Sequence, residues 1–113
     1  MSGWFELTRN DKGHFHFVLK AGNAETILSS EAYQAKSSAE SGIASVQANC
    51  SLDERYERYE RKVSTNGKPF FNLKASNGQV IGSSQMYASE SNRDAGITSV
   101  KANGTSKTIK ELA

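Results

Sequence analysis

The chain has 113 residues, of which 36% are hydrophobic and 23% charged, and its 14 basic and 12 acidic side chains leave a formal net charge of +2. This composition indicates one globular domain and excludes a large multidomain enzyme and a disordered chain. No apolar run reaches the roughly 18–20 residues of a membrane span, and residues 1–6 do not resemble a signal peptide, so we expect a cytoplasmic protein that does not enter membranes. The single cysteine, Cys50, excludes an internal disulfide.

The first half of the chain predicts three strands and then a helix. Apolar and polar residues alternate over roughly residues 3–9, 14–21 and 25–29, which is the period of half-buried strands, and polar turns separate them. After these strands, Ser37 and Glu40 have the spacing of a capping box at a helix start. The expected helix carries one apolar stripe, formed by Ala39, Ile43, Val46 and Cys50.

The second half repeats the first with a shift of 54 residues. Aligning residues 3–49 with residues 57–103 gives 18 identities in 47 positions, far above chance for unrelated segments. The shift predicts strands at roughly 57–63, 68–75 and 79–83 and a second helix after them. A unit of this size is close to the lower limit for a separate core, so we expect the two units to share one.

The two predicted helices have several special residues in common. Ser91 repeats the capping serine, and Asn49 and Gly104 suit left-handed helix ends. Gly42 and Gly96 lie in the middle of the helices, where glycine costs about 1 kcal/mol relative to alanine. Because both copies carry this cost, we expect each helix to approach the sheet or the other helix closely at its glycine.

No linker separates the two units. Extended segments are expected after each helix, at residues 56–62 and 108–112, and the first of them runs directly into the second unit. We therefore predict an α+β fold in which one domain contains two β-β-β-α-β repeats, residues 3–55 and 56–113. The repeats are expected to form a single, largely antiparallel sheet with both helices on one face.

Five segments carry distinctive motifs: residues 3–7 (GWFEL), 17–23 (FVLKAGN), 71–75 (FNLKA), 81–87 (IGSSQMY) and 96–105 (GITSVKANGT). These motifs resemble those of the duplicated YegP-like proteins, a family of uncharacterised bacterial proteins. The resemblance implies that the last strand of each repeat is exchanged to the other half of the sheet. One departure is the doubled Tyr-Glu-Arg at residues 56–61. The family brings no established activity with it, so the resemblance bears on the fold and leaves the function open.

The two histidines, His14 and His16, are spaced so that both face one side of a strand, as a metal-binding pair requires. The second repeat has no histidine at the matching positions, and a site would need a further ligand such as Asp11 or Glu6. We interpret both as surface histidines and assign no metal and no cofactor.

Two other repeated features suggest catalysis but have simpler explanations. Serine pairs recur at 29–30 and 83–84, and hydroxyls at a strand end commonly bond the local backbone. Glu6 and Glu60 are expected to form cross-strand ion pairs with Lys20 and Lys74. No catalytic residues are therefore assigned.

The sheet face turned away from the helices is the main functional candidate. Interleaved aromatic and basic side chains on an open sheet are typical of platforms for single-stranded nucleic acid, and such a face can also bind protein. Alternation places on it Trp4, Glu6, His14, His16, Val18, Lys20, Leu28, Arg58, Glu60, Lys62, Phe70, Asn72 and Lys74. The candidate binding residues among them are Trp4, His16, Lys20, Arg58, Phe70 and Lys74.

Charge is distributed unevenly along the chain. Residues 1–54 have a net charge of −3 and residues 55–113 a net charge of +5, which weakens the case for a continuous basic footprint. We predict a small, non-enzymatic binding or structural module that acts through the open sheet face, as a monomer or weak homodimer. The sequence does not identify its partner and leaves both a protein and single-stranded nucleic acid open. Weak binding of single-stranded nucleic acid is the alternative function, and an uncharacterised enzymatic activity is a third.

Overall fold

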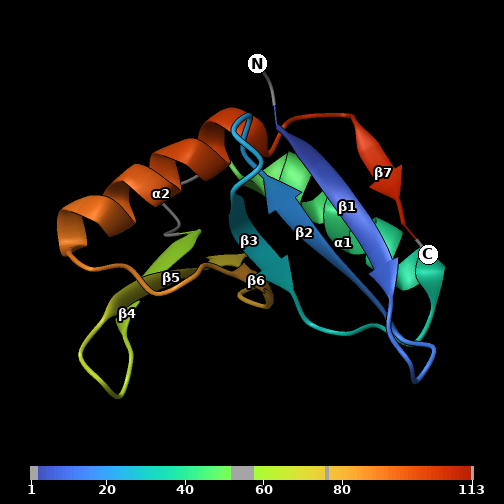
Figure 1. Ribbon diagram of the computed structural model, residues 1–113, viewed down its shortest axis with the longest axis horizontal. Coiled ribbons are helices and arrows are strands. Elements are labelled where there is room, and N and C mark those ends of the chain that lie inside the picture. The colour runs from blue at the N-terminus through green and yellow to red at the C-terminus, as the bar shows by residue number, and fades with distance from the viewer. Residues whose placement is uncertain (1–2, 52–57, 76, 113) are drawn as a thin grey trace.

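The computed structural model describes residues 3–51, 58–75 and 77–112, whose path is drawn in Figure 1. Two helices and seven strands lie within these residues. Along the chain they are β1 (Trp4–Arg9), β2 (Phe15–Lys20), β3 (Thr26–Ser30), α1 (Lys36–Asn49), β4 (Tyr59–Val63), β5 (Pro69–Lys74), β6 (Val80–Ser83), α2 (Glu90–Asn103) and β7 (Ile109–Glu111).

The seven strands form one mixed sheet in the order β4-β5-β6-β3-β2-β1-β7. Its two halves meet where β3 and β6 pair antiparallel, with Ser29 opposite Ser83. β7 runs parallel to β1, and Phe5 N donates to Thr108 O at 2.9 Å. The other strand pairings in the described part of the chain are antiparallel. The last strand of the second half thus extends the sheet of the first half.

The predicted α+β class is confirmed, and the sheet is mixed because of the parallel β7. Strand positions follow the alternation of the sequence to within about two residues where they are described. The expected start of the fourth strand at residue 57 lies outside the described residues, as do the first two of the six residues of the doubled Tyr-Glu-Arg. The final extended segment, predicted at residues 108–112, contains β7.

The core is one cluster to which both halves contribute. Phe5 and Phe17 pack edge to face with ring centroids 6.0 Å apart, and Tyr59 and Phe71 repeat this contact at 5.6 Å. Because these side chains belong to the same buried cluster, neither half has a core of its own. The buried apolar residues are Phe5, Leu7, Phe17, Leu19, Ile27, Leu28, Ala39, Ile43, Val46, Cys50, Tyr59, Phe71, Leu73, Ile81, Ile97 and Val100.

The placement of Leu28 on the open face was wrong. Its side chain is only 1% exposed. The pairing of β2 with β3 shifts register between Leu19 and Lys20, so that Leu28 lies opposite Leu19 while Thr26 lies opposite Lys20. After such a bulge, the side chains point to the opposite face from the one that strict alternation predicts, so the face assigned to Leu28 was wrong.

The predicted capping boxes were also wrong. N-caps at Ser37 and Ser91 would start the helices at residues 38 and 92, but both helices begin two residues earlier. Ala35 is the N-cap of α1 and provides no side-chain hydrogen bond. Ser89 is the N-cap of α2, and its hydroxyl accepts a hydrogen bond from Asn92 N at 3.1 Å. Before α2 the sequence offers both Ser89 and Ser91 as capping candidates, and the chain uses the earlier one, whereas α1 begins without a side-chain cap.

The predicted left-handed helix ends are absent at the two C-caps. Cys50 and Gly104 have φ values of −62° and −68°, both in the right-handed helical region. Their N–H groups donate to Val46 O at 2.9 Å and Val100 O at 2.7 Å, so each cap residue continues the helical hydrogen-bond pattern.

Cys50 and Gly104 occupy equivalent positions in the two repeats and contact each other in the core. A Cβ added to Gly104 would lie 2.7 Å from Cys50 Sγ and 2.8 Å from Cys50 Cβ. The space therefore holds one side chain, which explains why the repeats differ here. Cys50 is fully buried, as predicted for a small core residue, and burial raises the pKa of its thiol.

We expect Gly104→Ala to lower the free energy of unfolding by about 1–2 kcal/mol, because its methyl group meets Cys50. Adding Cys50→Gly should recover part of this loss, because in the double variant residue 104 fills the space and residue 50 leaves it free. Urea denaturation of wild type, both single variants and the double variant gives the coupling directly. Strictly additive effects would show that the two residues do not compete for one space.

Candidate functional site

One face of the sheet carries the side chains that alternate with the buried core residues. In β1 and β2, Glu6 and Val18 lie opposite each other and are half-buried. In the other half, Asn72 lies opposite both Glu60 and Ser83. In each half, side chains of this face therefore lie next to one another across neighbouring strands.

The structure divides the six predicted binding residues into two groups. Trp4, His16 and Lys20 lie on β1 and β2, whereas Phe70 and Lys74 lie on β5 and Arg58 precedes β4. Strands β3 and β6 lie between β2 and β5 and separate the groups. The six residues therefore do not form one cluster.

In the first group, the ring of Trp4 already has two polar partners. Its Nε1 donates to the Glu6 carboxylate at 2.9 Å, and Lys110 Nζ lies 4.3 Å from the ring centroid. Lys20 Nζ donates to Thr26 Oγ1 at 2.7 Å. Trp4, rather than the predicted Lys20, is thus the partner of Glu6, and β7 supplies the cation that covers the indole.

In the second group, Glu60 is the centre of a small polar network. Its carboxylate accepts a hydrogen bond from Asn72 Nδ2 at 3.1 Å and lies 4.0 Å from Lys74 Nζ, as the predicted Glu60–Lys74 pair requires. Ser83 Oγ donates to Asn72 Oδ1 at 2.6 Å. The Asn72 hydrogen bond lowers the pKa of Glu60 and burial opposes it, while Lys62 and Lys74 lower it further.

The histidines lie apart from any metal-binding cluster. His16 Nδ1 is 3.0 Å from Thr8 Oγ1 on the neighbouring strand. Among the described residues, no group of three or more His, Cys, Asp or Glu side chains is placed to share a metal ion. Likewise, no helix in the described residues is long and apolar enough to cross a membrane.

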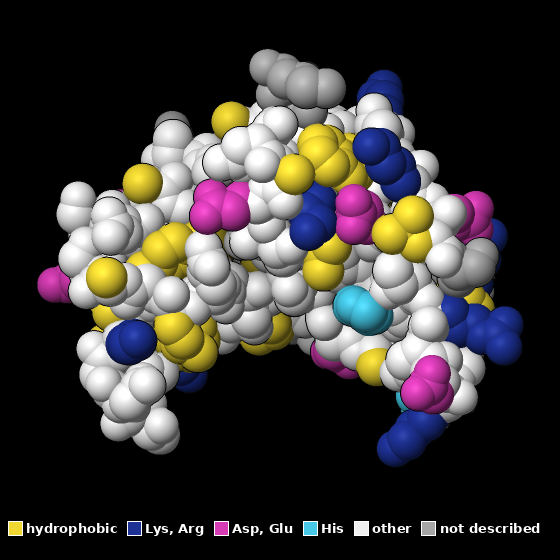
Figure 2. All heavy atoms as spheres, in the orientation of Figure 1, with side chains coloured by type: hydrophobic (Ala, Val, Ile, Leu, Met, Phe, Trp, Pro, Cys, Tyr) yellow, Lys and Arg dark blue, Asp and Glu magenta, His cyan; other side chains and the backbone are white. Residues whose placement is uncertain are grey.

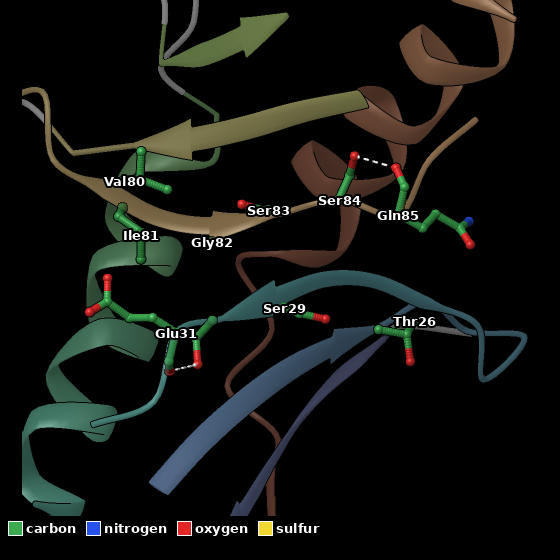
Figure 3. A pocket seen from close by; sticks show the side chains of 10 residues that line it. Thr26, Ser29, Glu31, Val80, Ile81, Gly82, Ser83, Ser84 and Gln85 are labelled. Carbon is green, nitrogen blue, oxygen red and sulfur yellow. Dashed lines mark hydrogen bonds between the residues drawn. The ribbon is translucent and has the colours of Figure 1, made fainter. Parts of the chain in front are cut away.

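A groove lies between the two groups and was not predicted from the sequence. It has a volume of about 500 Å³ and follows the junction of β3 and β6, where Figure 3 shows side chains from both strands along its walls. In the space-filling view, the outline of the molecule is hollowed between the β1–β2 half and the β4–β5 half (Figure 2). The residues that line it are Thr26, Ser29, Ser30, Glu31, Val80, Ile81, Gly82, Ser83, Ser84 and Gln85.

The groove is built from equivalent residues of the two repeats. Ser29 and Ser83 lie opposite each other at its middle, and each is the other's counterpart under the 54-residue shift. Thr26 and Val80 are a second equivalent pair, as are Glu31 and Gln85. The repeated Ser-Ser dipeptide was the sequence signal for this place, but only the pairing of β3 with β6 brings its two copies together.

The second serine of each dipeptide has the structural role that was predicted for it. Ser30 Oγ accepts a hydrogen bond from Phe17 N at 2.9 Å and donates to Glu31 O at 2.7 Å. Ser84 makes the same two bonds, to Phe71 N at 3.0 Å and Gln85 O at 2.8 Å. Both hydroxyls are engaged by the backbone, where they close the end of a strand.

Comparison with known proteins gives this fold a family. The family of the domain of unknown function DUF1508 matches the chain twice, over residues 10–57 and 64–111, which differ by the same 54-residue shift. The chain belongs to the DUF1508, or YegP-like, family. The YegP protein of Escherichia coli, described as a UPF0339 protein, is 60% identical over 111 residues, which cover 98% of each chain. A UPF0339 protein of Acinetobacter baylyi is 62% identical over 112 residues, 99% of this chain and 98% of the relative.

Solved structures of DUF1508 relatives have the same fold. The solution structure of the Escherichia coli YegP protein, described as a protein of unknown function, aligns with a TM-score of 0.90 at 60% identity over 99% of this chain and 94% of that one. That of a UPF0339 protein from Shewanella oneidensis aligns with a TM-score of 0.91 at 54% identity, over 99% and 92% of the two chains. None of these descriptions assigns an activity, so the function has to be argued from the site.

Proposed function

We propose that this protein is a small, non-enzymatic module that binds another protein through the open sheet face, in the bacterial cytoplasm. The observation that carries the proposal is the groove at the β3–β6 junction, because both repeats contribute equivalent residues to it. Hydroxyl and amide side chains line it, and such groups bind the peptide groups of a partner chain.

The distribution of charge favours a protein over single-stranded nucleic acid. The described residues that line the groove include no Lys or Arg, so a phosphate backbone finds no cation there. Trp4 and Phe70, the aromatic residues that would stack on bases, lie on strands β1 and β5, with three other strands between them in the sheet. Lys110 also covers part of the Trp4 ring.

The non-enzymatic part of the proposal is supported by the engagement of the candidate nucleophiles. Ser30 and Ser84 hold backbone groups with both hydroxyl functions, and Cys50 is buried with a raised pKa, which keeps the thiol protonated. A protein partner requires no reactive group.

The finer architecture on which this surface depends is also proposed. Both helices cover the face opposite the groove, and the last strand of each repeat, residues 3–55 and 56–113, is exchanged to the other half. The pairing of β7 with β1 supports the exchange, and its counterpart in the first repeat lies outside the described residues. Contacts of both α1 and α2 with β2 and β5 support the placement of the helices.

A bulky side chain in the middle of the groove should abolish partner binding. Ser29 is exposed, so Ser29→Trp should leave the fold intact while it fills the groove. We expect amide signals of β2, β3, β5 and β6 in the ¹⁵N-labelled wild type to broaden when unlabelled cell extract is added, and those of Ser29→Trp to stay sharp. The matched control is Ala44→Trp at an exposed position of α1, which should behave like wild type.

The same labelled samples distinguish the alternative. A single-stranded oligonucleotide that shifts Phe70 and Lys74 signals at low salt and releases them at moderate salt would favour nucleic-acid binding. Broadening that both tryptophan variants lose equally, or that involves only helix residues, would contradict a role for the groove.

A further inference from the structure

Two further pockets lie against the helices and share wall residues with the groove: Glu31, Val80 and Ile81 in one case and Gln85 in the other. The α1 pocket has a volume of about 230 Å³ and lies between α1 and the turn from β5 to β6. The α2 pocket has a volume of about 340 Å³ and lies between α2 and the turn from β2 to β3. The walls of each pocket therefore come from a helix of one repeat and a hairpin of the other.

The two pockets are equivalent under the 54-residue shift. Several residues of one wall recur as the same amino acid at the equivalent position of the other. The shared pairs are Tyr33 and Tyr87, Gly42 and Gly96, Ser45 and Ser99, Ile27 and Ile81, and Ala21 and Ala75. A random surface hollow would not recur with the same chemistry on both sides of the molecule.

The acidic residues of the pockets show a compensation between the repeats. The α1 pocket has Glu31 from its own repeat and Gln79 from the other. In the α2 pocket the two side chains are exchanged: Gln85 stands at the position equivalent to Glu31, and Glu25 at the position equivalent to Gln79. Each repeat differs from its twin at both positions, yet each pocket has one carboxylate and one amide among its described lining residues.

In each pocket a carboxylate and a tyrosine line the same walls. Burial raises the pKa of Tyr33, and Glu31 raises it further. Burial also raises the pKa of Tyr87, where Gln85 acts in the opposite direction and Glu25 in the same one. The Tyr87 hydroxyl oxygen is buried and has no hydrogen-bond partner within the described part of the chain.

The ligand chemistry follows from these groups. A carboxylate, an amide oxygen and a phenol oxygen can accept three hydrogen bonds, which is the number that a primary ammonium group donates. The lining includes no Lys or Arg in either pocket, among the described residues, so an anion has no charged partner. The side chains of Ile81 and Ile27 provide an apolar wall for a short alkyl chain.

We propose that the two pockets are a pair of equivalent binding sites for small aliphatic primary ammonium compounds, one beside each helix. Each site takes its tyrosine from the repeat that supplies the helix and half of its Glu–Gln pair from the other repeat. The site thus exists only in the fused molecule, which gives the duplication a functional consequence.

The test is a titration of the ¹⁵N-labelled full chain with n-butylammonium chloride, followed through the amide signals of Gly42 and Gly96. A ligand of this size is expected to bind with a dissociation constant on the order of millimolar, and to shift both signals. Glu31→Gln should weaken the response of Gly42 about tenfold and leave Gly96 unchanged. Glu25→Gln should do the reverse, so each pocket serves as the control for the other.

Two isosteres separate charge recognition from unspecific contact. Neutral n-butanol and anionic butyrate should leave both glycine signals in place at concentrations at which n-butylammonium moves them. Equal shifts with n-butanol, no shift with n-butylammonium up to about 100 mM, or loss of both responses in either single variant would overturn the proposal. Both substitutions keep the side-chain size at exposed positions, so folding does not limit the test.

Discussion

Replacing Phe71 with alanine is expected to lower the free energy of unfolding by about 3–5 kcal/mol and to destabilise both repeats together. The Phe71 ring is fully buried. It contacts Tyr59 edge to face, with centroids 5.6 Å apart, and stacks on Tyr87 at 6.3 Å. Alanine at this position leaves a cavity between these rings that the surrounding strands cannot close fully.

The spread of the effect to the first repeat follows from the shared core. Phe71 belongs to the same buried cluster as Phe17, its equivalent on β2. The sheet is continuous through β3 and β6, and β7 joins β1, so the second repeat also completes the sheet of the first. One cooperative transition is therefore expected, with no intermediate in which only one repeat is folded.

Hydrogen exchange measured at the amides of β2 and β5 tests this directly. Phe71→Ala and Phe17→Ala should accelerate exchange in both strands to the same degree, whereas Val63→Ala, at a position that is 63% exposed, should change neither. Faster exchange confined to β5 in the Phe71 variant would mean that the repeats unfold separately, and the shared core would be refuted.

The sequence allowed the strands and the repeat to be predicted because both are local patterns. Phe17 and Phe71 fall in alternating segments that recur at a fixed distance, and burial of one side of a strand imposes that alternation. The mid-helix glycines were also informative, since a costly residue conserved between repeats indicates a steric need.

Other features could not be predicted because they depend on contacts between distant segments. The bulge beside Leu19 shifts the pairing register of β2 and β3, and no residue type in either strand indicates it. The groove requires Ser29 and Ser83 to be partners, which is known only when β3 and β6 are paired. Similarly, the match of Glu31 with Gln79 becomes visible only when the β5–β6 turn is placed beside α1.

The partner of the mid-helix glycines was only half predicted. The close approach was expected from the sheet or from the other helix, and Phe17 of β2 does lie beside Gly42. The group that both glycines have in common, however, is a tyrosine that follows β3 or β6. Tyr33 and Tyr87 stack on Phe17 and Phe71 with interplanar angles of 8° and 10°. The chain thus inserts a ring between helix and sheet, and only glycine leaves room for it.

Gly96→Val is accordingly expected to lower the free energy of unfolding by about 3 kcal/mol. A Cβ at this position would lie 2.2 Å from the Tyr87 hydroxyl oxygen and 2.6 Å from Cζ, so the whole ring would have to leave its stack on Phe71. Ala95→Val, one residue earlier and exposed, introduces the same side chain without this contact and should cost less than about 0.7 kcal/mol.

The double variant identifies the tyrosine as the cause. In a Tyr87→Leu background the ring is gone, so Gly96→Val should cost clearly less than in the wild type, and urea denaturation of the four proteins gives the difference as a coupling energy. If Gly96→Val costs the same in both backgrounds, the glycine is required by something other than Tyr87. Gly42→Val should also be destabilising, because the added Cβ would lie 2.7 Å from the Tyr33 hydroxyl oxygen and 2.8 Å from Phe17 Cε2, so two rings would have to move.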